Sequence, residues 1–212
     1  MASRGLFLDL DGTLADSLPA MEAAYRALLR RFGREGSAAE FKSLNGPPAT
    51  VIVERIAKAH ALPTPTEELL AIYRDLVAEA HAAAPPAAGA REVLERARKQ
   101  DWTVALVTSA AYADARQWLA RVGLAAYVQV VVGGDEVRHG KPDPEPYRVA
   151  LQRTGCNAQE SLAVEDSVQG AKAAMAAGLP TWLIGAERGR ESAPLPLLRG
   201  RLADFHALLA LL

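Results

Sequence analysis

LFLDLDGTLADS, residues 6–17, carries the pattern from which the rest of the chain can be interpreted. Its first three residues are large and apolar, which is typical of a short buried strand. Asp9 and Asp11 follow two residues apart, so on an extended chain their side chains point the same way. Two carboxylates at the end of a buried strand repel each other and are costly to desolvate. The stretch therefore predicts a cation beside Asp9 and Asp11, with Gly12 allowing a sharp turn.

Two other kinds of structure place acidic residues in a stretch like this one. An acidic turn after a strand can be only a solvated loop, because perturbed carboxylates can also be structural. A calcium loop needs acidic or Asn residues at its first, third and fifth positions, Gly at the sixth and Glu at the twelfth. Here Gly12 falls at the fourth position and no Glu follows in register, so calcium fits poorly.

The composition is that of an ordinary globular protein. The chain has 212 residues, of which 50% are hydrophobic and 23% charged, and this suits one large domain or a domain with an insertion. A net charge of −1 offers no basic footprint for nucleic acid or an anionic membrane. The single cysteine, Cys156, suits a reducing compartment. No signal peptide is recognised before Leu6, and no apolar stretch is long enough to span a bilayer. We therefore expect a soluble, cytoplasmic protein, monomeric or weakly dimeric, without nucleic-acid or membrane partners.

Residues 17–83 carry only helical patterns. Apolar residues recur at helical spacing in four segments: 19–32, a short one from Ser37, 49–61 and 66–83. Ser17 is a candidate N-cap for the first of them. Since no strand pattern occurs in this block, we predict an all-helical insertion over residues 17–83.

After Pro85-Pro86 the chain alternates between helices and strands. The predicted helices span residues 88–100, 112–122, 145–154 and 169–177, and the strands that follow them span 103–107, 128–132, 161–164 and 181–184. This alternation predicts a parallel sheet covered on both faces. We therefore predict an α/β fold: a Rossmann-like core, residues 1–16 and 84–212, and an inserted all-helical cap, residues 17–83. A Pro/Gly-rich stretch, 185–196, is expected to precede a last helix near 204–211.

Ligands of open parallel sheets bind beyond the carboxyl ends of the strands, so the residues after each strand are the candidates for chemistry. They are Asp9 and Asp11 after the first strand, Thr108 and Ser109 after the second, Lys141 beyond a Gly-rich loop after the third, and Glu165 and Asp166 after the fourth. One edge of the sheet is thus expected to collect four carboxylates, a hydroxyl pair and one lysine.

In order and spacing, DLDGTLADS, VTSA, the lysine of KPDP, and EDS resemble the four motifs of the haloacid dehalogenase superfamily. The helical insertion is similar to the small cap of its phosphoglycolate phosphatases and β-phosphoglucomutases. The resemblance extends over residues 6–184. It implies a Mg²⁺-dependent phosphatase that hydrolyses a small phosphorylated metabolite through an aspartyl-phosphate.

The resemblance also implies roles for individual residues. Asp9 is the implied nucleophile, and Asp11 the acid that protonates the leaving oxygen and the base that later activates water. The implied Mg²⁺ ligands are Asp9, the Asp11 backbone carbonyl, Asp166 and, directly or through water, Glu165. The residues implied around the phosphate and the substrate are Asp9, Leu10, Asp11, Thr108, Ser109, Lys141 and, in the cap, Asn45 and Gly46. Ser167 is either a helix N-cap or a contact of the metal shell.

Three other activities are consistent with parts of this pattern. The dehalogenase reaction itself does not use a second aspartate in this way, so Asp11 favours phosphate chemistry. A β-phosphoglucomutase carries an arginine after the corresponding cap turn to hold a second phosphate, whereas Ala49 and Thr50 stand here, with Lys42 and Arg55 as the nearest cations. A signalling module that only accepts phosphate on an aspartate is about half this length and lacks a helical insertion.

Overall fold

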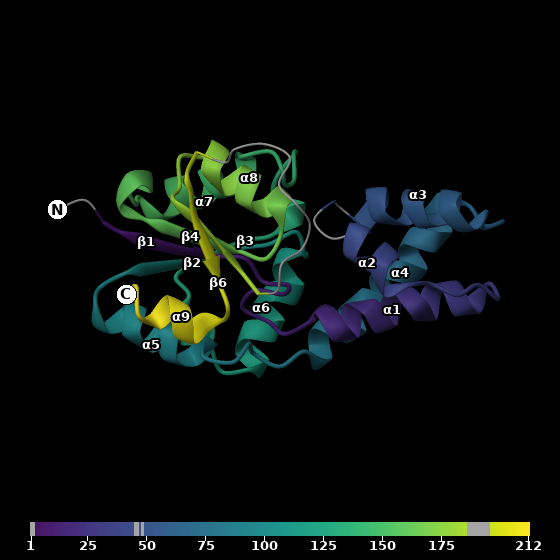
Figure 1. Cartoon of the computed structure of the whole chain (residues 1–212), viewed down its shortest axis with the longest axis horizontal. Coiled ribbons are helices and arrows are strands. Elements are labelled where there is room, and N and C mark those ends of the chain that lie inside the picture. Colours follow the sequence, from purple (N-terminus) through teal and green to yellow (C-terminus); the bar gives the residue numbers. More distant parts are fainter. Residues whose placement is uncertain (1–2, 45–46, 48, 186–195) are drawn as a thin grey trace.

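The computed structural model describes residues 3–44, 47, 49–185 and 196–212. Within them, an α/β core joins a group of helices that extends from one end of it (Figure 1). Six strands form one sheet in the order β3-β2-β1-β4-β5-β6, and every neighbouring pair is parallel. The strands are β1 (Gly5–Leu8), β2 (Thr103–Val107), β3 (Val130–Val132), β4 (Leu162–Glu165), β5 (Thr181–Ile184) and β6 (Leu198–Leu202). The predicted α/β fold with a parallel sheet is confirmed.

Strand β1 lies in the middle of the sheet, between β2 and β4, and all of its residues are buried. Its side chains alternate between two apolar clusters: Leu6 and Leu8 belong to one face of the sheet, and Phe7 to the other. The chain builds the sheet outward from β1 in both directions, to β2 and β3 on one side and to β4 and β5 on the other. In such sheets the ligand site lies beyond the carboxyl end of the strand where the order reverses.

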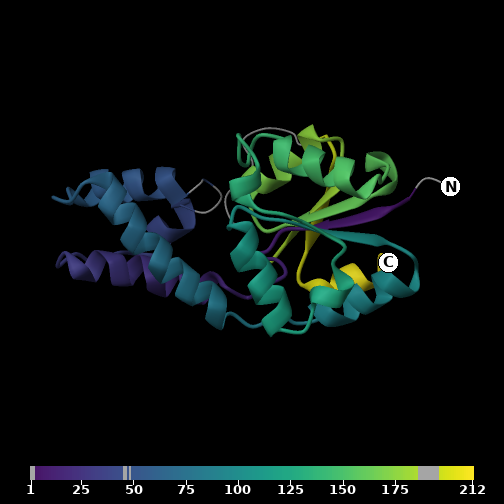
Figure 2. The ribbon, with the colours of Figure 1, turned by 180° about the vertical axis from the view of Figure 1, so that it is seen from behind.

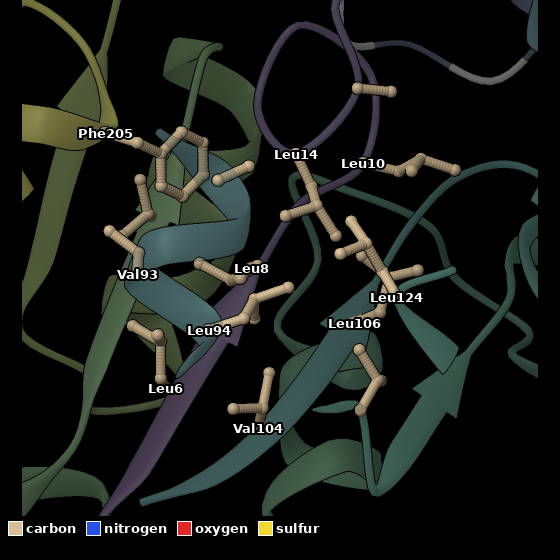
Figure 3. Close-up of a cluster of buried hydrophobic side chains, with 14 of the residues drawn as sticks. Leu6, Leu8, Leu10, Leu14, Val93, Leu94, Val104, Leu106, Leu124 and Phe205 are labelled. Carbon is tan, nitrogen blue, oxygen red and sulfur yellow. The ribbon is translucent and has the colours of Figure 1, made fainter. Parts of the chain in front are cut away.

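Helices cover both faces of the sheet (Figures 1 and 2). One face carries α5 (Ala90–Lys99), α6 (Tyr112–Arg121) and α9 (Phe205–Leu209), and the other carries α7 (Glu145–Thr154) and α8 (Val168–Ala176). Figure 3 shows the first interface, where Val93 and Leu94 of α5 lie over Leu6, Leu8 and Leu106 of the strands. Three short 3-10 turns complete the core: η1 (Ala125–Tyr127), η2 (Gly134–Glu136) and η3 (Ala158–Glu160).

Helices α1 (Leu18–Arg31), α2 (Ala38–Leu44), α3 (Ala49–His60) and α4 (Thr66–Ala83) form the group beside the core, called here the cap helices. They surround an apolar cluster of their own, with Tyr25, Leu28, Val53, Ile56 and Leu69 fully buried in it. Among the described residues of 17–83 there is no strand, as the sequence predicts. The division into domains at residues 16/17 and 83/84 stays a prediction.

The two segments that connect the cap helices to the core lie side by side. Asp16 donates its N–H to the Pro85 carbonyl, and Ala87 donates its N–H to the Leu14 carbonyl, each at 2.9 Å. The indole of Trp118, in α6, donates to the Ala84 carbonyl at 2.9 Å. The insertion therefore enters and leaves the core at one place.

One strand was not predicted, and one local prediction was wrong. The strand, β6, lies at the edge of the sheet and precedes the predicted last helix, which is present as α9. Ser17 makes no capping hydrogen bond to α1, because its hydroxyl is directed to Asp11 instead. Among the described residues, no helix combines the length and the apolar character needed to cross a bilayer.

Candidate active site

The turn after β1 places the two aspartates. Asp9 directly follows the strand and donates its N–H to the Val164 carbonyl of β4 at 3.1 Å. The chain then folds back, because Ala15 donates its N–H to the Leu10 carbonyl at 2.8 Å. The Leu10 side chain is fully buried in the apolar cluster of Figure 3, so only its backbone can face a ligand. Asp9 and Asp11 both line the same pocket, as the sequence predicts.

Gly12 is required in this turn for two reasons. Its φ of +76° lies in the left-handed region that favours glycine. A Cβ added at Gly12 would lie 2.5 Å from a carboxylate oxygen of Asp166. The backbone of the turn therefore lies so close to Asp166 that a residue with a side chain would not fit at position 12.

Lys141 is buried among the carboxylates. Its Nζ donates to Asp9 Oδ1 at 2.7 Å, to Glu165 Oε1 at 2.5 Å and to the Val107 carbonyl at 2.9 Å. Burial lowers the pKa of Lys141, but the charges and hydrogen bonds of Asp9 and Glu165 outweigh it and raise the pKa above its usual range. The lysine is therefore a charged group held in place on three sides, and not a solvated surface residue.

Glu165 is fully buried and held by several groups at the end of β4. In addition to Lys141, the hydroxyl of Tyr147 donates to Glu165 Oε1 at 2.6 Å. A Cβ on Gly170 would come within 2.0 Å of Glu165 Oε2, so this glycine leaves room for the carboxylate against the first turn of α8. Ser167 is the N-cap of that helix, since its Oγ accepts the Gly170 N–H at 3.1 Å.

Three buried carboxylates could hold a metal ion. Asp9, Glu165 and Asp166 each offer an oxygen, and these oxygens all lie within 4.8 Å of one another. Burial, followed by the charge of Glu165, raises the pKa of Asp9 well above its usual value. Because the charged form of Asp9 is so disfavoured, a divalent cation at this place would relieve both desolvation and repulsion. Carboxylate oxygens are the ligands of hard cations such as Mg²⁺, and the residues present fit one.

Thr108 and Ser109 follow β2 at the same edge of the sheet. Thr108 is buried, and its Oγ1 accepts the Ala110 N–H at 3.0 Å. Ser109 is exposed and lines the pocket. Gly134 allows the neighbouring loop to approach, because a Cβ there would lie 2.4 Å from the Ser109 carbonyl oxygen.

A pocket of about 610 Å³, measured out to its open mouth, lies between the core and the cap helices. Its core wall is polar and includes Asp9, Asp11, Ser109, Lys141, Asp166 and Ser167. Its cap wall is mainly apolar: Leu18, Met21, Phe41, Leu44, Pro47, Ile52 and Tyr73. Among the described residues that line the pocket, Lys141 is the one cation. Lys42 and Arg55 are exposed and do not line it, and the predicted contacts Asn45 and Gly46 lie outside the described residues.

Asp11 has two partners that the sequence did not reveal. The hydroxyl of Ser17 donates to Asp11 Oδ1 at 2.6 Å, and His81 Nε2 lies 3.1 Å from Asp11 Oδ2. Burial lowers the pKa of His81, but Asp11 and Asp114 together raise it above its usual value. Burial, with the charge of Asp11, also raises the pKa of Tyr73 to about 12. Nothing in the local sequence around His81 marks it as a partner of a residue seventy positions earlier.

Comparison with known proteins agrees with this geometry. Residues 6–184 match the model of the haloacid dehalogenase-like hydrolases. The chain belongs to this family. The resemblance inferred from the four motifs is confirmed, and this haloacid dehalogenase-like hydrolase carries its acidic group where the fold places a ligand site.

Two curated relatives and one solved structure illustrate the similarity. This haloacid dehalogenase-like hydrolase is 33% identical to the phosphoglycolate phosphatase of Pseudomonas putida over 182 residues, 83% of this chain and 67% of the relative. It is 30% identical to the phosphorylated carbohydrates phosphatase of Thermotoga maritima, over 82% of this chain and 81% of the relative. The structure of a CbbY variant from Rhodobacter sphaeroides with xylulose 1,5-bisphosphate has the same fold, with a TM-score of 0.81, 20% identity, and coverage of 97% and 95%. The chain is therefore a phosphatase of the phosphoglycolate phosphatase-like branch.

Proposed function

We propose that this phosphatase is Mg²⁺-dependent and hydrolyses a small phosphorylated metabolite through an aspartyl-phosphate at Asp9. The observation that carries the proposal is the buried Asp9 carboxylate, bonded to Lys141 at 2.7 Å and grouped with Glu165 and Asp166. The two curated relatives, which act on phosphoglycolate and on phosphorylated carbohydrates, support the substrate class.

Asp9 is the nucleophile in this proposal. A phosphate monoester is a dianion, and at roughly 4 Å and an effective dielectric of about 20 each unit-charge pair with a carboxylate costs about 4 kcal/mol. Lys141 offsets part of this repulsion and, through its bond to Oδ1, orients the Asp9 carboxylate for in-line attack. Charge stabilisation and positioning supply most of the rate in phosphoryl transfer, which accounts for a fully buried cation at this place.

The Mg²⁺ ligands in this proposal are Asp9, the Asp11 backbone carbonyl and Asp166, with Glu165 binding directly or through water. A bound Mg²⁺ would supply further positive charge against the phosphoryl oxygens. Glu165 is the weakest candidate for a direct ligand, because its Oε1 already accepts from Lys141 and Tyr147. Its carboxylate then acts mainly by fixing Lys141.

Asp11 is the acid and base. Its carboxyl group gives a proton to the leaving alcohol oxygen when Asp9 is phosphorylated. It then takes a proton from the water that hydrolyses the aspartyl-phosphate. The hydroxyl of Thr108 and the backbone N–H of Ser109 hold the phosphoryl oxygens, while the apolar cap wall excludes bulk water from the pocket.

A screen of phosphorylated metabolites tests this function. With Mg²⁺ present, we expect phosphate release from small monophosphates such as phosphoglycolate and hexose phosphates, and none from the same compounds in chelator. Failure to release phosphate from any phosphomonoester, including p-nitrophenyl phosphate, would refute the proposal.

A product assay separates the phosphatase from a sugar-phosphate mutase. A mutase must bind a sugar bisphosphate in two orientations, and a bidentate arginine is suited to hold its distal phosphate. The described pocket wall of the cap has no such cation. We therefore expect β-glucose 1-phosphate with catalytic glucose 1,6-bisphosphate to yield inorganic phosphate and little glucose 6-phosphate. If glucose 6-phosphate forms faster than phosphate, the assignment is wrong, and Lys42 and Arg55 are the first residues to substitute.

A further inference from the structure

Both oxygens of the Asp11 carboxylate are held by residues at the ends of the cap helices. Ser17, directly before α1, donates to Oδ1 at 2.6 Å, and His81, in the last turn of α4, lies 3.1 Å from Oδ2 through Nε2. The His81 side chain is 6% exposed and lies where α4 packs against α6 of the core. It does not line the pocket.

The chemistry of the pair defines what His81 can do. Each oxygen of a carboxyl group keeps an acceptor lone pair when the group carries its catalytic proton on the other side, so an N–H at Nε2 of His81 serves as donor to Oδ2 both before and after proton transfer. A bond from Ser17 alone leaves the carboxylate free to turn about that oxygen, whereas a second donor on the other oxygen fixes its plane. Acid catalysis requires the acid to lie within hydrogen-bond reach of the leaving oxygen and correctly aimed, so the fixed plane matters for rate.

We propose that His81 is a positioning residue that orients the Asp11 carboxylate for proton transfer to the leaving alcohol. The inference rests on the proposed acid role of Asp11. His81 does not line the pocket, and it acts only through Asp11, by its N–H donor at a fixed distance. A neutral donor of similar reach would serve as well.

This role has a kinetic signature that a general structural role lacks. An alkyl alcohol is a poor leaving group and needs a proton as its bond to phosphorus breaks, whereas p-nitrophenolate leaves without one. The value of kcat/KM reports steps up to the phosphorylation of Asp9, so it is sensitive to leaving-group protonation and not to the later attack of water. Misplacing Asp11 should therefore lower kcat/KM for alkyl phosphates much more than for p-nitrophenyl phosphate.

Four variants of the full chain test the inference. His81→Leu removes the donor and keeps the site filled. His81→Gln places an amide N–H at a reach similar to Nε2, and His81→Asn is the same amide one methylene shorter. His60→Leu is the matched control, because His60 also bonds a carboxylate of the cap helices, Glu40 at 2.9 Å, away from the pocket.

The substrates are p-nitrophenyl phosphate and the better of phosphoglycolate and glucose 6-phosphate. We expect His81→Leu and His81→Asn to lower kcat/KM for the alkyl phosphate roughly 10- to 100-fold, and for p-nitrophenyl phosphate less than about threefold. We expect His81→Gln to keep most of the kcat/KM of the unsubstituted protein for the alkyl phosphate. We expect His60→Leu to change the ratio of the two kcat/KM values little. If His81→Leu does not fold, the Asn and Gln pair makes the same comparison.

Asp11→Asn separates failure of this inference from failure of the proposed function. If Asp11→Asn itself shows no preference for the good leaving group, the acid role of Asp11 is wrong. The other outcome is that Asp11→Asn lowers kcat/KM more for the alkyl phosphate than for p-nitrophenyl phosphate, as the acid role requires. If the His81 variants then lower both kcat/KM values equally, or change neither, His81 is not a positioning residue. A Gln variant as impaired as the Asn variant would overturn it as well.

Discussion

Replacing Asp9 with Asn is expected to lower phosphatase turnover by several orders of magnitude while leaving the fold intact. The amide has the same shape as the carboxylate but cannot attack phosphorus to form the covalent intermediate. Lys141 keeps its bonds to Glu165 and to the Val107 carbonyl, and the amide oxygen can still accept from it. Phosphate release at saturating substrate measures the loss.

The melting temperature is the second readout for Asp9→Asn. Burial and neighbouring carboxylates raise the pKa of Asp9, so its charge is unfavourable in the folded protein without a cation. In metal-free buffer the neutral amide should therefore not lower the melting temperature. Asp75→Asn, on the exposed side of α4, is the matched control and should retain full activity. Turnover near that of the unsubstituted protein would exclude Asp9 as the nucleophile.

Chelation of divalent metal is expected to abolish turnover, and added Mg²⁺ to restore it. Asp9, Glu165 and Asp166 together offer a hard oxygen site, and a phosphate dianion cannot approach three buried carboxylates that one lysine only partly neutralises. Ca²⁺ should substitute poorly, because its longer and looser coordination would misplace Asp9. Titration of activity with each ion after EDTA treatment measures this, and full activity in chelator would contradict the metal assignment.

The same titration ranks the ligands. Asp166→Ala should raise the Mg²⁺ concentration for half-maximal activity more than Glu165→Ala does, since Glu165 is already bound by Lys141 and Tyr147. Glu165→Ala should instead lower turnover at saturating Mg²⁺, because Lys141 loses one of its three hydrogen-bond acceptors. The reverse order of Mg²⁺ requirements would make Glu165 the principal ligand.

The convergence of the acidic residues could be predicted from the sequence because it follows from a simple rule. Parallel strands end at the same edge of a sheet, so the residues after β1, β2, β3 and β4 must meet there. Asp9, Lys141 and Asp166 are therefore close in space although more than 130 positions separate the first two. The burial of β1 was equally clear from its three large apolar residues.

The strand β6 could not be predicted because its sequence, LRGRL, has little apolar character. As an edge strand it has one buried residue, Leu202, and it is held in place mainly by its hydrogen bonds to β5. Gly200 lies beneath the ring of Trp182, where a Cβ would be 2.9 Å from the indole. In the sequence alone, a glycine at this position is more typical of a loop than of a strand.

The partners of Asp11 were missed for a different reason. Ser17 stands where an N-cap is expected, and the local pattern gives no sign that a carboxylate competes for its hydroxyl. His81 occupies one of the inward positions of a long helix, where a histidine is usually only part of the core. Both contacts depend on how the cap helices meet the core, and a one-dimensional pattern does not contain that geometry.

The side-by-side linkers have an evolutionary consequence. Ala15 and Pro86 pair directly, so the two ends of the segment that carries the cap helices are held together at the core. With respect to the sheet, this segment is one long surface loop. Closing a longer loop costs little, only about 0.6 kcal/mol for each doubling of its length. Helices could thus be added, lost or exchanged in this loop without disturbing strand order. Asp9 directly follows the central strand of the sheet and the apolar pocket wall lies on the loop, so this wall can vary without moving the acidic group.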